Sequence, residues 1–152
     1  MLQSDGDIIR GLGYVTIYSA YLEEQIDYLL EALGPIEPMT RSRQRLPTSK
    51  KIKEAKKCLS RLDSTELQSF PATLDACSRL FERRNELIHG RIYSGFGGLD
   101  RLRSGRASVP ERPVTADELY DLANKIFEMR SHVLAPQISQ IPRAIQAHVA
   151  GV

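Results

Sequence analysis

Four stretches of the chain carry apolar residues at the spacing of an amphipathic helix, and this pattern restricts the fold more than any other feature. They cover approximately residues 7–33, 48–62, 64–89 and 115–136 of the 152 residues. Each apolar stripe has to be buried against another element, and helices do this most simply by packing on one another. The sequence therefore predicts an all-α fold, an antiparallel four-to-five-helix bundle that forms a single domain over residues 1–152.

The connections between these stretches carry turn and capping signals. Gly34-Pro35 should end the first helix, and the arginine-rich residues 36–47 are expected to be a mobile basic linker. Thr48 or Ser49 is expected to cap the second helix. Pro71 predicts either a kink or a fresh start within residues 64–89.

Residues 90–114 are too long and too rich in glycine and arginine to be regular throughout. Residues 91–94 and 102–109 predict a short β-hairpin across residues 95–98, with a plain loop as the alternative. Thr115 and Glu118 have the spacing of a capping box, so the next helix should begin there. Pro136 is expected to end that helix, which leaves residues 137–152 as a tail or a short fifth helix.

Charge is strongly segregated along the chain, although the net charge is only +2. Acids dominate residues 5–31, whereas residues 41–61 are dominated by arginine and lysine. Such a cluster is a candidate surface for a phosphate backbone, and a solvated helix face is the alternative. The candidate RNA-binding residues are Lys50, Lys51, Lys53, Lys56 and Lys57, with Arg83 and Arg91 nearer the centre of the chain.

Residues 84–90 close the third helical stretch and hold the most distinctive combination of side chains. Asn85 and His89 are four apart and share a helix face, while Arg84 and His89 lie about 7.5 Å apart along the axis. Gly90 is expected to end the helix in the left-handed conformation. An imidazole and a guanidinium at a helix end suit chemistry on a phosphodiester. The alternative is that His89 is only a C-terminal cap on an ordinary solvated face.

The order Arg84, Asn85, His89 and Gly90 at the end of a helix resembles the signature of HEPN domains, a family of small α-helical ribonucleases. The resemblance implies a helical bundle and cleavage of RNA without a metal or cofactor. His89 would act as general acid or base, Arg84 would hold the scissile phosphate, and Asn85 would orient His89 or a phosphate oxygen. It further implies a homodimer in which two such sites face one cleft, with residues 64–89 near the two-fold axis.

The chain departs from the toxin–antitoxin members of that family at one position. In those members a tyrosine two residues after the histidine is the target of a nucleotidyltransferase antitoxin, and here that position is Arg91, with Tyr93 nearby. This departure speaks against that form of control, although a role as a toxin or defence effector with an antitoxin partner stays open. The family also contains inactive members, so a binding or scaffold module is the alternative to a ribonuclease.

Several other classes of protein are disfavoured by the sequence. No apolar run approaches the length of a membrane span and no secretory signal is visible, so a cytoplasmic protein without a membrane partner is expected. Cys58 and Cys77 are expected to be reduced thiols in the core. His132 and His148 have no partner at metal-ligand spacing, and no phosphate-binding loop motif is present.

Overall fold

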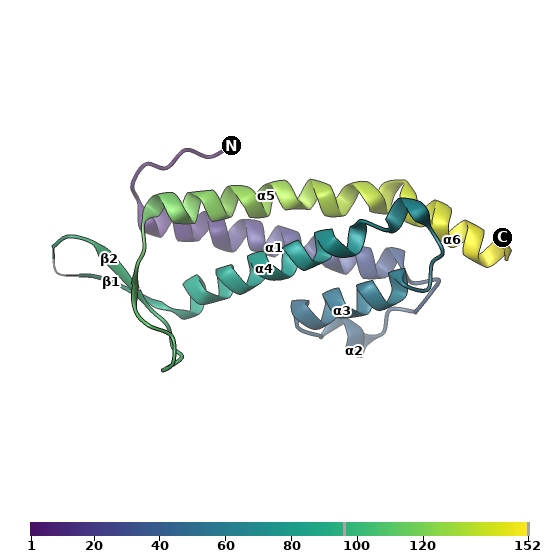
Figure 1. The fold of residues 1–152 in the computed structure, drawn as a ribbon, viewed down its shortest axis with the longest axis horizontal. Helices are drawn as coiled ribbons and strands as arrows, with labels where there is room; N and C mark the ends of the chain where they lie inside the picture. Colours follow the sequence, from purple (N-terminus) through teal and green to yellow (C-terminus); the bar gives the residue numbers. More distant parts are fainter. Residues whose placement is uncertain (96, 152) are drawn as a thin grey trace. The chain divides into compact units, whose positions relative to one another are not determined.

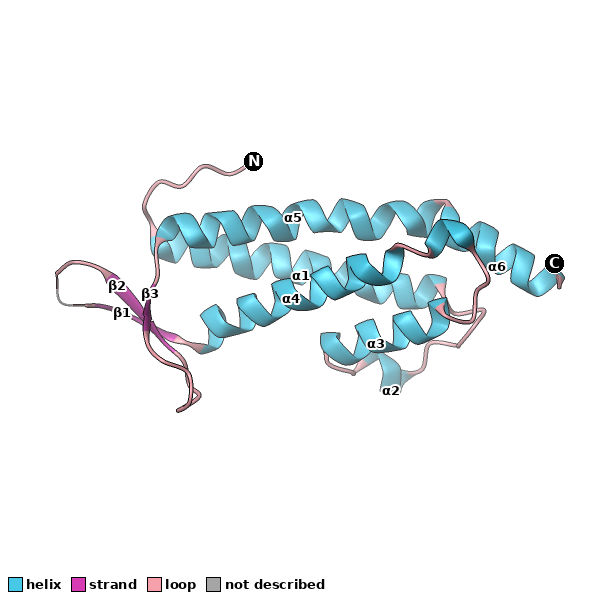
Figure 2. Cartoon of the chain, in the orientation of Figure 1, coloured by secondary structure: helices cyan, strands magenta, loops and turns pink. Residues whose placement is uncertain are grey.

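The chain is mainly helical, and three short strands follow α4 and precede α5 in the sequence (Figures 1 and 2). The computed structural model describes residues 1–95 and 97–151, and 65% of the chain is helical. The helices are α1 (Ile8–Ala32), α2 (Arg41–Gln44), α3 (Thr48–Leu59), the 3₁₀ turn η1 (Thr65–Leu67), α4 (Phe70–His89), α5 (Ala116–Ile138) and α6 (Gln140–Ala150). The strands are β1 (Arg91–Ser94), β2 (Asp100–Arg103) and β3 (Arg112–Pro113). The prediction of a predominantly helical chain is confirmed.

Helix boundaries follow the sequence signals in two places. The Thr115 hydroxyl accepts a hydrogen bond from the Glu118 backbone N–H at 3.2 Å, which is the predicted N-cap of α5. Pro71 is the second residue of α4, where its missing N–H removes no helical hydrogen bond. Of the two outcomes predicted for Pro71, the chain therefore takes the fresh start, after η1.

Three boundaries differ from the predictions. Residues 36–47, expected to be a mobile linker, contain α2, which Thr40 caps and which Arg43 ties back by donating to the carbonyls of Glu37 and Pro38 at 2.6 and 3.0 Å. Helix α3 begins at Thr48 itself after Pro47, so neither Thr48 nor Ser49 is its cap. Helix α5 does not end at Pro136 but continues to Ile138, and the short fifth helix expected beyond it is present as α6.

The sheet has the order β1-β2-β3 with antiparallel neighbours. The predicted hairpin is therefore confirmed, although its second strand covers Asp100–Arg103 and not residues 102–109. Gly97 and Gly98 have positive φ angles of 87° and 78° in the connection between β1 and β2. Phe96, which belongs to the predicted turn, lies outside the described residues.

The chain divides into two compact units: Met1–Ala20 with Arg79–Phe127, and Tyr21–Ser78 with Glu128–Val152. Helices α1, α4 and α5 contribute residues to both. The expectation of a single domain stays a prediction.

In the first unit, α1 and α5 run parallel and touch closely. A Cβ placed on Gly11 would lie 2.9 Å from the Leu119 Cβ, so the absence of a side chain at Gly11 allows the two helices to approach closely. The ring centroids of Tyr14 and Tyr120 are 5.6 Å apart. Further along both helices, those of Tyr18 and Phe127 are 5.0 Å apart. Because residue numbers rise together on both helices, this pair is parallel, unlike the arrangement expected for an antiparallel bundle.

The second unit holds a separate set of buried side chains. Its fully buried residues come from α1, α3, α4, α5 and α6, and include Leu22, Ile26, Leu29, Leu30, Ile52, Leu74, Cys77, Val133 and Ile141. The Gln137 amide donates to the backbone carbonyl of Gln25 at 3.1 Å, which ties α5 to α1 within this unit. Cys58 and Cys77 are buried free thiols, as predicted.

Candidate functional site

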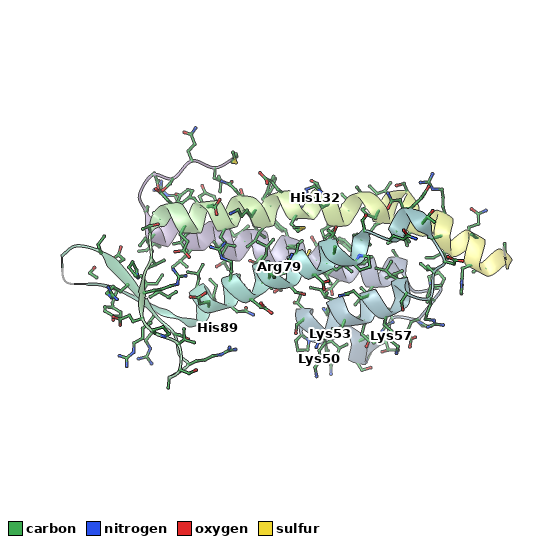
Figure 3. The ribbon with its side chains drawn as sticks, in the orientation of Figure 1. Lys50, Lys53, Lys57, Arg79, His89 and His132 are labelled. Carbon is green, nitrogen blue, oxygen red and sulfur yellow. The ribbon has the colours of Figure 1, made fainter. Side chains whose placement is uncertain are left out.

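The end of α4 presents the three candidate catalytic residues. Asn85 and His89 are exposed and Arg84 is half-buried, and the Arg84 Nη1 atom donates to Asn85 Oδ1 at 2.9 Å. His89 is the last residue of α4, at the point where the chain enters the sheet (Figure 3). Within residues 1–95 and 97–151 its side chain makes no hydrogen bond or ion pair. The imidazole is thus open to solvent and does not serve as a side-chain cap on the helix.

Gly90 ends α4 for a reason that differs from the prediction. The glycines with positive φ among the described residues are Gly6, Gly97, Gly98 and Gly151, so Gly90 is not left-handed. A Cβ on Gly90 would lie 2.4 Å from Leu102 Cδ1 and 2.7 Å from the Glu86 carbonyl oxygen. The residue must therefore be glycine because β2 packs directly against the end of α4.

The two faces of the β1–β2 hairpin have opposite character. The register pairs Arg91 with Arg103, Ile92 with Leu102, Tyr93 with Arg101 and Ser94 with Asp100. Leu102 is buried and Ile92 half-buried, so their face is turned toward the protein. The other face is turned toward solvent and carries Arg91, Tyr93, Arg101 and Arg103.

The loop after β2 passes close to the end of α4. A Cβ on Gly105 would lie 3.8 Å from the His89 carbonyl oxygen, and a Cβ on Gly90 would lie 3.4 Å from that of Arg103. The backbone of residues 103–105 is therefore in contact with residues 89–90. The backbone that follows the arginine-bearing hairpin therefore packs against the backbone of the residue that carries the candidate imidazole.

An ion-pair network holds β3 to the neighbouring helices. The Arg112 guanidinium donates to both Glu118 carboxylate oxygens at 2.8 Å and, through Nε, to Glu86 Oε1 at 2.9 Å. These carboxylates, Glu118 first, raise the pKa of Arg112 above its usual range. Arg83, predicted to bind RNA, lies 3.6 Å from Glu118 and is part of the same network. Its charge is therefore already partly compensated inside the protein.

The lysines of α3 separate into two groups. Lys51 pairs with Asp27 at 2.5 Å and Lys56 pairs with Asp75 at 2.6 Å, so these two cations link α3 to α1 and α4 within the second unit. The Lys51 side chain is only 12% exposed. The exposed members of the set are Lys50, Lys53 and Lys57, which share one face of α3 (Figure 3). Of the five predicted RNA-binding lysines, these three remain open to a ligand.

The structure thus brings Arg84, Asn85, His89 and Arg91 together in the first unit, while the lysines belong to the second. Tyr93 and Arg103 were not among the predicted site residues. Arg91 and Tyr93 are two residues apart on one predicted strand, so the sequence already indicated that they share a face. The residue opposite each of them depends on the strand register, which the sequence did not define.

The chain has two further histidines, His132 and His148. His132 and His148 are exposed, and no group of three or more metal-ligating side chains occurs among the described residues. None of the described helices is long and apolar enough to span a membrane. Comparison of the chain with protein-family models, curated proteins and solved structures yields no match.

Proposed function

We propose that this protein is a metal-independent endoribonuclease of the HEPN type, whose helices form a bundle and whose site is built from Arg84, Asn85 and His89. The observation that carries the proposal is the exposed, unengaged His89 at the end of α4, following the hydrogen-bonded Arg84 and Asn85 and leading into an arginine-bearing hairpin. A proton-transfer group and cations at one solvent-facing point are what cleavage of RNA requires.

The reaction follows from these groups. The 2′-hydroxyl oxygen forms a bond to phosphorus and loses its proton to a base, while the bond from phosphorus to the 5′-oxygen breaks and that oxygen gains a proton. Histidine is the side chain that changes its charge most readily near neutral pH, so His89 carries one of these protons. Arg84 offsets the negative charge that develops on the phosphate oxygens, and its hydrogen bond to Asn85 orients the guanidinium.

A second proton-transfer group is needed, and a second copy of the chain supplies it in this proposal. Two copies facing one cleft would provide His89 twice, as base and as acid. Self-association would draw on exposed apolar side chains of α1 and α5: Ile17 in the first unit, and Tyr28, Leu134 and Ile138 in the second. Light scattering at micromolar concentration tests this step, since a strict monomer would remove the composite site.

The decisive experiment follows cleavage of a single-stranded RNA by wild type and three variants. His89→Ala should lower the rate by roughly 10²–10⁴-fold, the usual contribution of a general acid or base. Arg84→Ala should cost roughly 10²–10³-fold, as does removal of a group that stabilises developing charge. Asn85→Ala should reduce turnover without abolishing it. The products should end in a 2′,3′-cyclic phosphate, and EDTA should leave the rate unchanged.

His132→Ala is the matched control, because it removes an exposed histidine from α5 and should leave cleavage as in wild type. Cleavage that survives His89→Ala, or that depends on a divalent ion, contradicts the mechanism. RNA binding without turnover in both wild type and His89→Ala would instead identify the chain as a binding module.

A further inference from the structure

The solvent-facing side of the β1–β2 hairpin places two like charges opposite each other. Arg91 and Arg103 are direct cross-strand partners, so their Cβ atoms lie about 4.5–5.5 Å apart. Both side chains are exposed, and among residues 1–95 and 97–151 neither has a carboxylate within 4 Å. Arg101, the next arginine on the same face, differs because its Nε lies 2.9 Å from Glu111. The protein therefore neutralises one arginine of this face and leaves a repelling pair beside it.

An exposed aromatic ring completes this face. Tyr93 is 42% exposed and is opposite Arg101 in the register. No ring contact or hydrogen bond of its side chain occurs within the described part of the chain. Its position two residues after Arg91 puts the two side chains on the same face, about 6.7 Å apart along the strand.

We propose that this face, defined by Arg91, Tyr93 and Arg103, is the surface on which a single-stranded RNA lies. A phosphate placed between Arg91 and Arg103 turns their repulsion into two charge-assisted hydrogen bonds. The ring of Tyr93 stacks on an unpaired base one step along the strand, a contact that tolerates any base. The separation along β1 is comparable to that between successive phosphates of an extended strand. A duplex fits this face less well, because its bases are stacked on one another and cannot stack on Tyr93. An acidic peptide also fits less well, because it carries negative charges without a flat ring beside each of them.

The location of the face connects it to the candidate catalytic residue. Arg91 follows His89 by two residues, and the backbone of residues 103–105 contacts that of residues 89–90. In this proposal, a strand held by the hairpin passes the His89 imidazole. In this respect the inference rests on the proposed function, since it names how that site holds its substrate, although binding itself is measured separately from cleavage.

The test uses a short, fluorescently labelled oligouridine with 2′-O-methyl groups, which cannot be cleaved because its attacking hydroxyl is blocked. Fluorescence anisotropy over a series of salt concentrations gives the affinity and its salt dependence. Arg91→Ala/Arg103→Ala should weaken binding and reduce the slope of log affinity against log salt by about 1.4, as expected for two lost phosphate contacts to a single strand. Tyr93→Ala should weaken binding roughly 5- to 150-fold, whereas Tyr93→Phe keeps the ring and should bind like wild type.

Two further variants serve as comparisons. Lys125→Ala removes an exposed cation of α5 that pairs with Asp121, and should leave affinity unchanged. Lys50→Ala/Lys53→Ala/Lys57→Ala removes the exposed face of α3. Circular dichroism melting confirms that each variant is folded, and loss of Arg91 or Arg103 should not lower the melting temperature because it relieves a repulsion.

Unchanged affinity and salt slope in both hairpin variants, or an effect confined to the lysine variant, overturns the inference. Failure of the proposed function gives a different result: the wild type cleaves no RNA, yet the hairpin variants still lose binding of the blocked oligonucleotide. Conversely, cleavage that depends on His89 together with normal binding by the hairpin variants removes the inference and leaves the proposed function standing.

Discussion

Replacing Arg112 by alanine should detach β3 from the two helices it joins and destabilise the protein measurably. The guanidinium makes two hydrogen bonds at 2.8 Å to Glu118 on α5 and one at 2.9 Å to Glu86 on α4. It is the group that holds these two carboxylates at one point. Without it, Glu86 loses the cation that the network gives it, and Glu118 keeps only the longer contact of 3.6 Å with Arg83.

The size of the effect can be worked out from exposure and geometry. Hydrogen bonds to charged groups contribute about 1.5–3 kcal/mol, and exposed ion pairs contribute about 0–1 kcal/mol. The side chains of Arg112 and Glu86 are 35% exposed and that of Glu118 is 22% exposed, so solvent screens the network in part. We expect Arg112→Ala to lower the free energy of unfolding by about 2 kcal/mol. For a chain of this size that corresponds to a fall in melting temperature of roughly 4–8 °C.

The assay is urea or thermal unfolding of Arg112→Ala, Glu118→Ala and the double variant. The double-mutant cycle should return a coupling energy of about 1–2 kcal/mol, since the two groups make a bidentate contact. Lys125→Ala is the control, because its pair with Asp121 is 53% exposed on both sides and should contribute less than about 0.5 kcal/mol. A coupling energy near zero, or equal losses in Arg112→Ala and Lys125→Ala, would refute the reasoning.

Two further predictions concern a close contact and a buried thiol. Gly90→Ala should destabilise the protein by about 1–3 kcal/mol, because the added Cβ would lie 2.4 Å from Leu102 Cδ1. Gly13→Ala should instead stabilise α1 by about 0.5–1 kcal/mol, because its added Cβ would have no atom within 4 Å. Melting temperatures that shift in the same direction in both variants would contradict this. Burial raises the pKa of the Cys77 thiol to about 12, so above about pH 9 the unfolded chain releases a proton that the folded chain keeps. Stability should therefore fall between about pH 9 and pH 12, and this fall should be smaller in Cys77→Ala, as measured by urea unfolding at each pH.

Much of the secondary structure could be predicted because its signals are local. The stripe over residues 7–33 corresponds to α1 at Ile8–Ala32, and the cap at Thr115 corresponds to the start of α5. Both rest on hydrophobic period or on a hydrogen bond three residues away, which neighbouring residues alone can specify. The regular structure within residues 36–47 was not predicted, since α2 is tied back by hydrogen bonds from the Arg43 side chain to the carbonyls of Glu37 and Pro38.

The candidate site divides in the same way. The placement of Asn85 and His89 on one face near the end of a helix followed from residues within two turns of each other, and α4 does end at His89. That both side chains are exposed is a finding of the structure. The sequence could not show which lysines of α3 are paired and which are exposed. Lys51 and Lys56 differ from Lys53 because each forms an ion pair with a carboxylate that is distant in the sequence. Asp27, for example, lies 24 residues from Lys51 in the chain, so the residues around Lys51 do not indicate this pair.

By itself, the sequence determined where the four long helical stretches lie and which faces they bury, and it indicated a hairpin after His89 as one of two possibilities, because each of these depends on periodicity or on turn chemistry within a few residues. Only the tertiary structure decided that α1 and α5 run parallel, since an apolar stripe is the same whichever way its helix points. The tertiary structure also decided that residue 90 must be glycine to make room for Leu102, and that Arg91 is opposite Arg103. A strand register is a pairing between distant residues, and a slip of one position would have turned these arginines to the other face.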